Sequence, residues 1–283
     1  MTLGDRVTRA REAIAAAGIR AEDAALDAEV LARKVLGCDR AGLVVRLRDE
    51  EPAVFAEAYR ALVDRRCRRE PVAYILGERE FWGLPFEVTP DVLIPRPETE
   101  LIVEEALHLF PAGRHPSVIV DAGTGSGCLA VALAREFSGA RVIATDISEK
   151  ALAVAGRNAA RNGAGRIEFR VGDLLEPVTE PADLIVSNPP YVASGDEAGL
   201  MPEVREHEPH VALFGGPDGL SLFERLFPAA AGRIRPGGRL IVEVGYDQDD
   251  RVAALAARHA WTLSHVRQDL QAITRTLIFV HEP

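Results

Sequence analysis

Cysteine is scarce in this sequence, and long apolar runs are missing. The 283 residues include three cysteines, Cys38, Cys67 and Cys128, at scattered positions. An odd number without close spacing suits a reducing compartment and argues against a disulfide framework or a metal site, so we interpret these cysteines as small core residues. No stretch approaches the ~20 apolar residues of a membrane span, and the N-terminus lacks a signal-peptide pattern. The sequence therefore predicts a soluble cytoplasmic protein.

Positive charge is also in deficit. Lysine and arginine number 33 against 43 acidic residues, which leaves a net charge of −10, and only Lys34 and Lys150 are lysines. A surface of this sign repels phosphate backbones, which disfavours sequence-independent binding to DNA or RNA. With 47% apolar and 27% charged residues the composition is that of an ordinary globular protein. The length allows one or two domains of ~100–200 residues each.

The first region, residues 1–76, has a helical rhythm. Apolar residues recur at intervals of three and four, which places them on one face of a helix, and glycines stand where two of the helices should end. The sequence therefore predicts a small helical bundle, either a packing appendage or a domain that recognises a partner. The positions that carry this pattern are Leu3, Val7, Ala10 and Ile14, the pairs Val54/Phe55, Ala58/Tyr59 and Leu62/Val63, and the glycines Gly18 and Gly37.

Four arginines lie close together near the end of this region, at Arg65, Arg66, Arg68 and Arg69. Such a run is usually a solvated helix face. A surface for an anionic partner is the alternative, and the sequence leaves both interpretations open.

A short bridging segment, residues 77–97, follows. The run Phe81-Trp82-Gly83-Leu84-Pro85-Phe86 places two β-rich stretches around a glycine turn, which predicts a hairpin. Prolines at 95 and 97 then hold an extended stretch, and the carboxylates Glu98 and Glu100 suit the first turn of a helix that we expect to reach about Phe110.

The remaining region, residues 98–283, alternates short apolar strands with helical stretches. This pattern is typical of an α/β fold with a parallel sheet covered on both faces, and seven strands predict a doubly wound, Rossmann-like domain. We expect strands at residues 118–121, 142–146, 167–171, 184–187, 240–244, 261–266 and 276–280, and helices at 127–137, 149–162, 219–234 and 249–257.

The first strand of this domain ends in a glycine-rich loop with the sequence Asp121-Ala122-Gly123-Thr124-Gly125-Ser126-Gly127. Glycines allow a tight turn and a close approach of the backbone to a ligand. A dinucleotide fingerprint would need a glycine at the place of Cys128, and no Gly-Lys-Ser/Thr follows, so the loop fits neither NAD nor a nucleoside triphosphate.

The next two strands end in acidic residues. Asp146 closes the second strand, where a carboxylate can accept hydrogen bonds from both hydroxyls of a ribose. Asp173 and Leu174 follow the third strand, where the carboxylate could accept from an adenine amine while the leucine packs on the ring. The competing interpretation of Asp173 is a simple helix cap.

The fourth strand ends in Asn188-Pro189-Pro190-Tyr191. Elsewhere such a stretch would be a proline turn, but here it lies at the carboxyl edge of the sheet, where ligands bind. Because prolines lack an N–H, the Pro189 carbonyl has little local competition as an acceptor. This carbonyl and the Asn188 side chain can both accept from a planar –NH₂ group, and Tyr191 offers a flat face for stacking. This arrangement favours an amino-methyltransferase.

Several motifs together resemble the class I S-adenosylmethionine-dependent methyltransferases and, among them, the bacterial release factor glutamine methyltransferases. The resemblance covers nearly the whole chain. It implies a seven-stranded sheet, S-adenosylmethionine as cofactor, and methylation of the glutamine amide in the Gly-Gly-Gln tip of class 1 release factors. The motifs are Arg79-Glu80-Phe81-Trp82-Gly83, Leu93-Ile94-Pro95-Arg96-Pro97-Glu98-Thr99-Glu100, the glycine loop, the Asn-Pro-Pro-Tyr loop, and Glu208-Pro209-His210-Val211-Ala212-Leu213.

The resemblance also implies roles for particular residues. The glycine loop from Gly123 to Gly127, Asp146, Leu174 and Asn188 would line the cofactor, Asn188, Pro189, Pro190 and Tyr191 would hold the glutamine, and the N-terminal helical domain would dock the release factor. One departure stands near the C-terminus, where Ala272 occupies a position at which the family usually has glycine.

Three alternatives accompany this reading. The sibling that methylates a glutamine of a large-subunit ribosomal protein has a similar tetrapeptide, although residues 94–100 look more like the release-factor enzyme. A DNA amino-methyltransferase would need a target-recognition region that we do not find. A protein that binds the cofactor without transferring the methyl group is the third.

Overall fold

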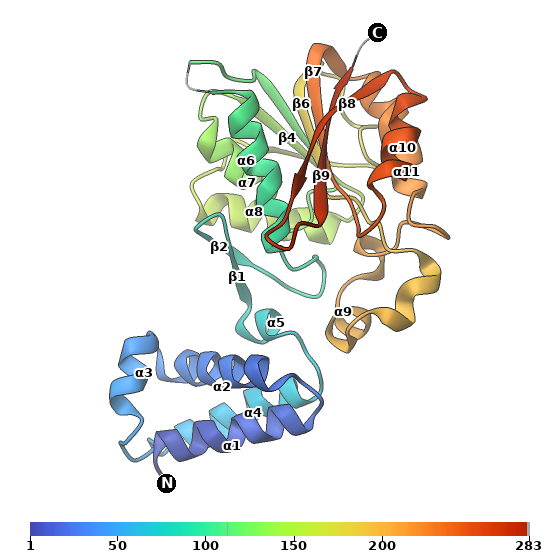
Figure 1. Cartoon of the computed structure of the whole chain (residues 1–283). Helices are drawn as coiled ribbons and strands as arrows, with labels where there is room; N and C mark the ends of the chain where they lie inside the picture. Colours follow the sequence, from blue (N-terminus) through green and yellow to red (C-terminus); the bar gives the residue numbers. More distant parts are fainter. Residues whose placement is uncertain (112, 282–283) are drawn as a thin grey trace. The chain divides into compact units, whose positions relative to one another are not determined.

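The computed structural model describes residues 1–111 and 113–281, and it divides into two compact units (Figure 1). The first consists of Met1–Gly77 together with the short segment Met201–His207, and the second consists of Glu78–Leu200 and the chain from Glu208 onward. The chain therefore leaves the second unit once, contributes one helix to the first, and returns.

The first unit is helical, as the apolar spacing predicts. Leu3, Ile14, Leu31, Phe55 and Tyr59 are buried in its core. The expected helix ends are confirmed, because Gly37 adopts the left-handed conformation that closes a helix. The helices are α1 (Leu3–Ala16), α2 (Ala21–Leu36), α3 (Arg40–Arg46), α4 (Phe55–Cys67), α5 (Val72–Leu76) and α9 (Pro202–His207).

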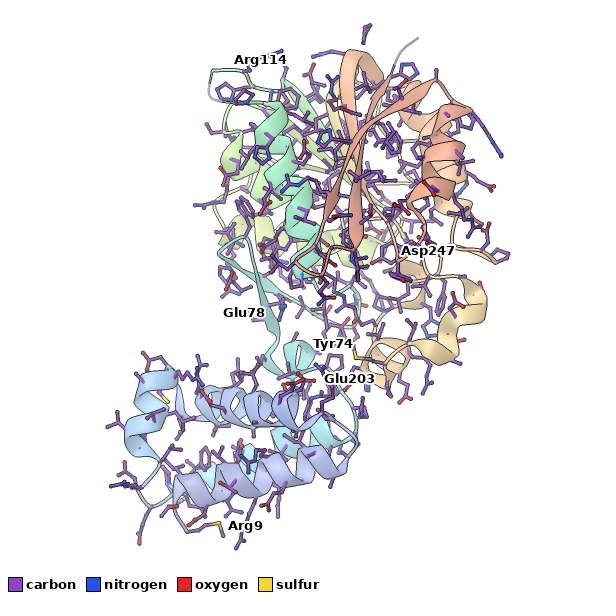
Figure 2. All side chains as sticks on the ribbon, viewed as in Figure 1. Arg9, Tyr74, Glu78, Arg114, Glu203 and Asp247 are labelled. Atoms are coloured by element: carbon purple, nitrogen blue, oxygen red, sulfur yellow. The ribbon has the colours of Figure 1, made fainter. Side chains whose placement is uncertain are left out.

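Two members of the arginine cluster, Arg66 and Arg69, form ion pairs within the first unit. The Arg66 side chain is 7% exposed and pairs with Asp27 at 2.6 Å and with Glu203 at 3.0 Å. Arg69 pairs with the other oxygen of Glu203 at 2.6 Å, and Figure 2 labels Glu203 on α9. Neither a solvated helix face nor a surface for an anionic partner describes Arg66 and Arg69, because both guanidinium groups already pair with carboxylates of this chain. Arg68 is exposed.

The cysteines differ from one another in burial. Cys128 is buried in α7 (Cys128–Glu136), whereas Cys38 and Cys67 are only partly buried. Their interpretation as core residues is therefore correct for Cys128 alone, since the other two pack at the margin of the helical core.

The second unit is built on a seven-stranded sheet in the order β5-β4-β3-β6-β7-β9-β8. All seven predicted strands are present, and the predicted hairpin is the antiparallel pair β1–β2. The strands are β1 (Glu78–Phe81), β2 (Leu84–Glu87), β3 (Val118–Ala122), β4 (Arg141–Asp146), β5 (Glu168–Val171), β6 (Ala182–Ser187), β7 (Ile234–Glu243), β8 (Trp261–Gln268) and β9 (Thr274–His281).

The sheet is mostly parallel, but β9 runs antiparallel to both of its neighbours. Only residues 269–273 separate β8 from β9, whereas a parallel pair needs a crossover of about a dozen residues. In this turn Ala272 takes the left-handed conformation, with φ of 61°. The alanine therefore keeps the backbone shape that a glycine would adopt, and Asp269 holds it by accepting from the amides of Gln271 and Ile273.

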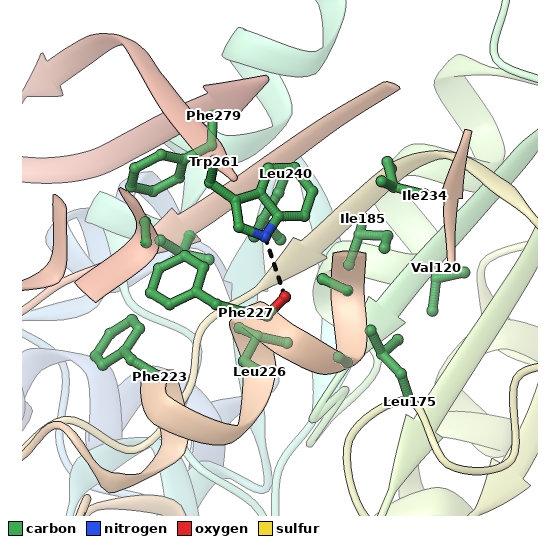
Figure 3. Packing of buried hydrophobic residues seen from close by; sticks show 14 of the residues in the cluster. Val120, Leu175, Ile185, Phe223, Leu226, Phe227, Ile234, Leu240, Trp261 and Phe279 are labelled. Carbon is green, nitrogen blue, oxygen red and sulfur yellow. Dashed lines mark hydrogen bonds between the residues drawn. The ribbon is translucent and has the colours of Figure 1, made fainter. Parts of the chain in front are cut away.

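Helices cover both faces of the sheet, as predicted (Figure 1). Strand β3 supplies Val120 to one face and Ile119 to the other. On the first face, Trp261 packs among phenylalanines of α10 and its indole Nε1 donates to the Phe227 carbonyl at 3.0 Å (Figure 3). The helices are α6 (Glu100–Leu109), preceded by the 3₁₀ turn η1 (Pro97–Thr99), α7, α8 (Glu149–Arg161), α10 (Ser221–Ala231) and α11 (Asp249–Ala257).

The chain between β6 and α10 contains short elements that the sequence pattern did not predict, namely η2 (Ser194–Gly199), α9 and η3 (His210–Ala212). Buried Glu208 fastens this stretch to the segment before α6, because its carboxylate accepts from the Ile94 amide at 3.1 Å and from Arg96. In the described part of the chain, no helix combines the length and apolar character that a membrane crossing requires.

Candidate active site

A cavity of about 250 Å³ opens at the carboxyl edge of the sheet. Strands β3, β4 and β6 are parallel neighbours, so the loops that follow them meet at this edge, and ten of the twelve predicted site residues line the cavity. Gly127 and Tyr191 are not among its lining residues. The ten are residues 123–126, Asp146, Asp173, Leu174 and residues 188–190.

The glycine loop is shaped to leave room beside its backbone. Gly123 and Gly125 have φ of 76° and 55°, and a Cβ added to either would meet no atom within 4 Å. Their missing side chains therefore leave space that a ligand can use. The loop itself is held in place, since the amides of Gly123 and Thr124 both donate to the Thr145 carbonyl at 2.9 Å.

Packing against a neighbouring helix also requires a glycine at position 127. Its φ is 82°, and a Cβ there would lie 2.9 Å from the Cβ of Ala155 on α8. The glycine therefore permits α7 to start close against α8, which is a packing requirement.

Asp121, the first residue of the motif, stabilises the glycine loop through hydrogen bonds. Its Oδ2 accepts from the Thr124 hydroxyl at 2.6 Å and from the Ala130 amide at 3.1 Å. The carboxyl group is fully buried, which raises its pKa to about 7. Asp121 thus ties the strand end to the first turn of α7.

Asp146 is oriented by two backbone amides. Its Oδ1 accepts from Ser148 and its Oδ2 from Gly125, each at 2.9 Å. Burial raises the pKa of this carboxyl group, and the amide hydrogen bonds oppose the shift. Because each carboxylate oxygen has more than one lone pair, both can still accept a hydrogen bond, which fits a vicinal diol in the cavity.

Asp173 and Leu174 lie at the cavity wall after β5. The Asp173 carboxylate is paired with Arg225 of α10. Leu174 has a positive φ of 49°, and its carbonyl accepts from the Thr145 hydroxyl at 2.6 Å. A non-glycine residue in this conformation is held by its surroundings at some cost in energy. Ile147 is a lining residue that sequence reasoning missed, and its side chain is 61% exposed.

The Asn-Pro-Pro-Tyr loop is anchored at both of its ends. The Asn188 side-chain Nδ2 donates to the Thr99 hydroxyl at 3.0 Å, and the Tyr191 hydroxyl donates to Glu243 at 3.1 Å. Burial is the main cause that raises the pKa of Tyr191. Gln248 adds a hydrogen bond of 2.9 Å to the Tyr191 carbonyl. The loop is therefore a rigid part of the cavity wall.

Thr99 and Glu243 are further residues that sequence reasoning did not assign. Thr99 belongs to the motif of residues 94–100 and lines the cavity, so the motif was a usable signal. Glu243 is the last residue of the apolar strand β7 and lies at the same sheet edge. Because ligands bind at this edge, an acidic residue here is a candidate for a functional role.

Relatives of this chain agree with the geometry. A family model described as the PrmC N-terminal domain matches residues 6–77, and one described as the methyltransferase small domain matches residues 99–204. A release factor glutamine methyltransferase of Geobacter sulfurreducens is 47% identical, covering 90% of this chain and 89% of its own. One of Cereibacter sphaeroides is 43% identical, covering 97% of each.

The chain belongs to the release factor glutamine methyltransferase family. Solved structures extend the likeness in fold. A methyltransferase of Pyrococcus furiosus superposes with a TM-score of 0.54 at 21% identity, covering 70% of this chain and 89% of that one. A T. thermophilus 16S rRNA methyltransferase, solved with AdoMet and guanosine, gives 0.52 at 19% identity over 72% and 50%. The predicted methyltransferase fold is therefore confirmed.

Proposed function

We propose that this enzyme transfers a methyl group from S-adenosylmethionine to the side-chain amide nitrogen of the glutamine in the Gly-Gly-Gln motif of class 1 release factors. One observation carries the proposal. In this chain, which belongs to the family, residues 123–126, Asp146, Asn188 and Pro189 line a single cavity. The cofactor and the amide would therefore meet in one place.

The cofactor half of the cavity fits S-adenosylmethionine. The open space beside Gly123 and Gly125 would accommodate it against the loop backbone with Thr124 and Ser126, and Asp146 would accept from the ribose hydroxyls. Leu174 would pack on the adenine ring, and Asp173 would lie near its amine. When bound, S-adenosylmethionine supplies an electrophilic methyl group on a sulfonium sulfur.

The substrate half acts by orientation. The nitrogen of an amide is a poor nucleophile because its lone pair is delocalised into the carbonyl. The Asn188 side-chain oxygen and the Pro189 carbonyl would accept its two hydrogens and direct its lone pair toward the methyl group. The same two acceptors stabilise the positive charge that develops on the nitrogen as the carbon–sulfur bond of the cofactor would break, and the methylated nitrogen would then release one proton. Tyr191 would support the amide with its ring, and Pro190 would stiffen the loop.

A transfer assay tests the reaction. Labelled methyl from S-adenosylmethionine is expected on a purified class 1 release factor and not on a variant with alanine in place of the Gly-Gly-Gln glutamine. Label on the variant would exclude this acceptor. Label on neither protein, but on a large-subunit ribosomal protein, would favour the sibling enzyme, and cofactor binding without any transfer would favour a silent binder.

The wider setting follows from this substrate. Because translation termination takes place in the cytoplasm, we place the enzyme there, acting on protein alone without direct contact with nucleic acid or membrane. The net charge of −10 supports this, because a surface of that sign repels phosphate groups.

The division of labour follows the predicted regions. Residues 1–76 would dock the release factor, residues 77–97 would link the domains, and residues 98–283 would carry out the transfer. Three exposed valines of the first unit, Val44, Val45 and Val54, offer apolar surface for such docking, with exposed fractions of 59%, 78% and 80%.

A substitution tests docking better than truncation does, because deleting residues 1–76 would also remove the partners of Glu203. We expect Val45→Asp to raise the KM for the whole release factor about tenfold, the effect of ~1.4 kcal/mol of lost contact. The rate with a short Gly-Gly-Gln peptide, which serves as the internal control, should not change. An unaltered KM for the whole protein would remove this face from the docking surface.

A further inference from the structure

A buried chain of hydrogen bonds joins the Asn-Pro-Pro-Tyr loop to Thr99 and Glu243. Glu243, at the end of β7, is 2% exposed, and so is Thr99. The Thr99 hydroxyl donates to Glu243 Oε2 at 2.6 Å, while the Tyr191 hydroxyl donates to Oε1 at 3.1 Å. One carboxylate therefore accepts two hydroxyl protons, one from Thr99 and one from Tyr191 of the loop.

The direction of these bonds determines how Asn188 is turned. A hydroxyl has a single proton to donate, and Thr99 gives its proton to Glu243. Toward Asn188, the Thr99 oxygen can then only accept. The Asn188 side chain must present its –NH₂ to Thr99, as the 3.0 Å contact between Nδ2 and Oγ1 has it, and its Oδ1 is left for the cavity.

This orientation matters because the two ends of an amide differ in chemistry. An Asn188 with Oδ1 toward the cavity can accept from a substrate –NH₂. With the amide reversed, two –NH₂ groups would face each other, and neither could accept. A pocket that depends on one acceptor therefore needs a device that excludes the reversed rotamer.

We propose that Thr99 and Glu243 are positioning residues, which act through Asn188 by keeping its amide oxygen turned toward the substrate nitrogen. The inference rests on the proposed methyl transfer to a glutamine amide. Neither residue needs to touch the reacting atoms, because the proton order of the chain sets the orientation of Asn188.

The two hydroxyl donors require a particular chemistry at position 243. Only a group that accepts on both oxygens can receive Thr99 and Tyr191 together. Glutamine in its place has one donor end and would force one of the two hydroxyls to accept instead. If Thr99 accepts from that end, its proton must go to Asn188, which then turns its oxygen away from the cavity.

The test compares Thr99→Val, Thr99→Ser and Glu243→Gln in the full-length enzyme with a release factor as substrate. We expect Thr99→Val to lower kcat about 10–100-fold, the range known for residues that orient metal ligands. Glu243→Gln should lower kcat less, because a glutamine that turns its oxygen toward Thr99 leaves Asn188 in place. The Kd for S-adenosylmethionine should change little, and the melting temperature should fall by only a few degrees, because buried polar groups lose a partner while the fold is kept. Thr99→Ser, which keeps the hydroxyl, should restore most of the rate.

A double-mutant cycle separates positioning from other roles. In the Asn188→Ala background there is no amide left to orient, so adding Thr99→Val should cost no further rate. Losses that multiply would overturn the proposal, as would a Thr99→Ser enzyme as slow as Thr99→Val. Labelling by the wild-type enzyme is measured first, so failure of the proposed function and failure of this inference are distinguishable.

Discussion

The Asn188→Ala enzyme is expected to transfer methyl groups about a hundredfold more slowly than the wild type at saturating substrate and cofactor, the loss typical of removing one preorganised polar group from a reaction site. The substitution removes one of the two acceptors that hold the amide. The acceptor is worth most when positive charge develops on the nitrogen, so kcat should fall much more than ground-state binding does.

Cofactor binding distinguishes this outcome from a general collapse of the site. The Asn188 side chain contacts Thr99 and lines the cavity. Because we assign its oxygen to the substrate amide, the Kd for S-adenosylmethionine, measured by calorimetry, should remain close to that of the wild type. Val171→Ala, at an exposed residue that is not among those lining the cavity, serves as the control and should leave kcat nearly unchanged. Equal losses in kcat and in cofactor affinity would contradict the role of Asn188 as an acceptor for the amide.

Asp146→Ala is expected to have the opposite signature. It removes both acceptors for the ribose hydroxyls and should weaken cofactor binding by ~1–3 kcal/mol, the cost of leaving hydrogen-bonding groups unpaired in a buried site. It also frees the Gly125 amide that Asp146 holds, which loosens the glycine loop. At saturating cofactor, kcat should recover much of its wild-type value, because the hydrogen bonds of Asp146 go to Gly125 and Ser148 and we assign it no role toward the amide.

Two comparisons sharpen this second result. Asp173→Ala should cost less affinity than Asp146→Ala, because Asp173 would accept from a single adenine amine beside its ion pair with Arg225, whereas Asp146 would accept from two ribose hydroxyls. Acidification should imitate Asp146→Ala, since burial raises the pKa of Asp146 and protonation removes an acceptor as the pH falls through it. Calorimetry showing the same Kd for Asp146→Ala and the wild type would take Asp146 out of the binding site.

Much of the second unit could be predicted because its signals are local. Short apolar runs, each ending in a glycine or a carboxylate, mark the parallel strands, and such strands deliver the loops after them to one edge. This is why Gly123, Asp146 and Asn188, which lie far apart along the chain, were expected together and line one cavity. The direction of β9 was missed because alternation of side chains does not reveal it, although the short connection after β8 was a usable signal for an antiparallel pair.

Residue roles were less predictable than residue positions. The glycine loop reads as a ligand-binding loop, but only packing distinguishes Gly123, which faces open space, from Gly127, which lies against Ala155. The arginine cluster reads as surface, and only the return of the chain through α9 brings Glu203 against Arg66 and Arg69.

By itself, the sequence determined the α/β architecture, the helical N-terminal region and the position of the tetrapeptide that we propose as the amide-binding loop, because each is encoded in neighbouring residues as a period, a turn or a motif. Only the tertiary structure decided which side chains meet behind that tetrapeptide. Thr99 and Glu243 lie on separate elements, and no periodicity links them, yet their 2.6 Å hydrogen bond helps to orient Asn188. Contacts of this kind depend on how the strands and helices pack in three dimensions, and a local pattern of residues does not encode them.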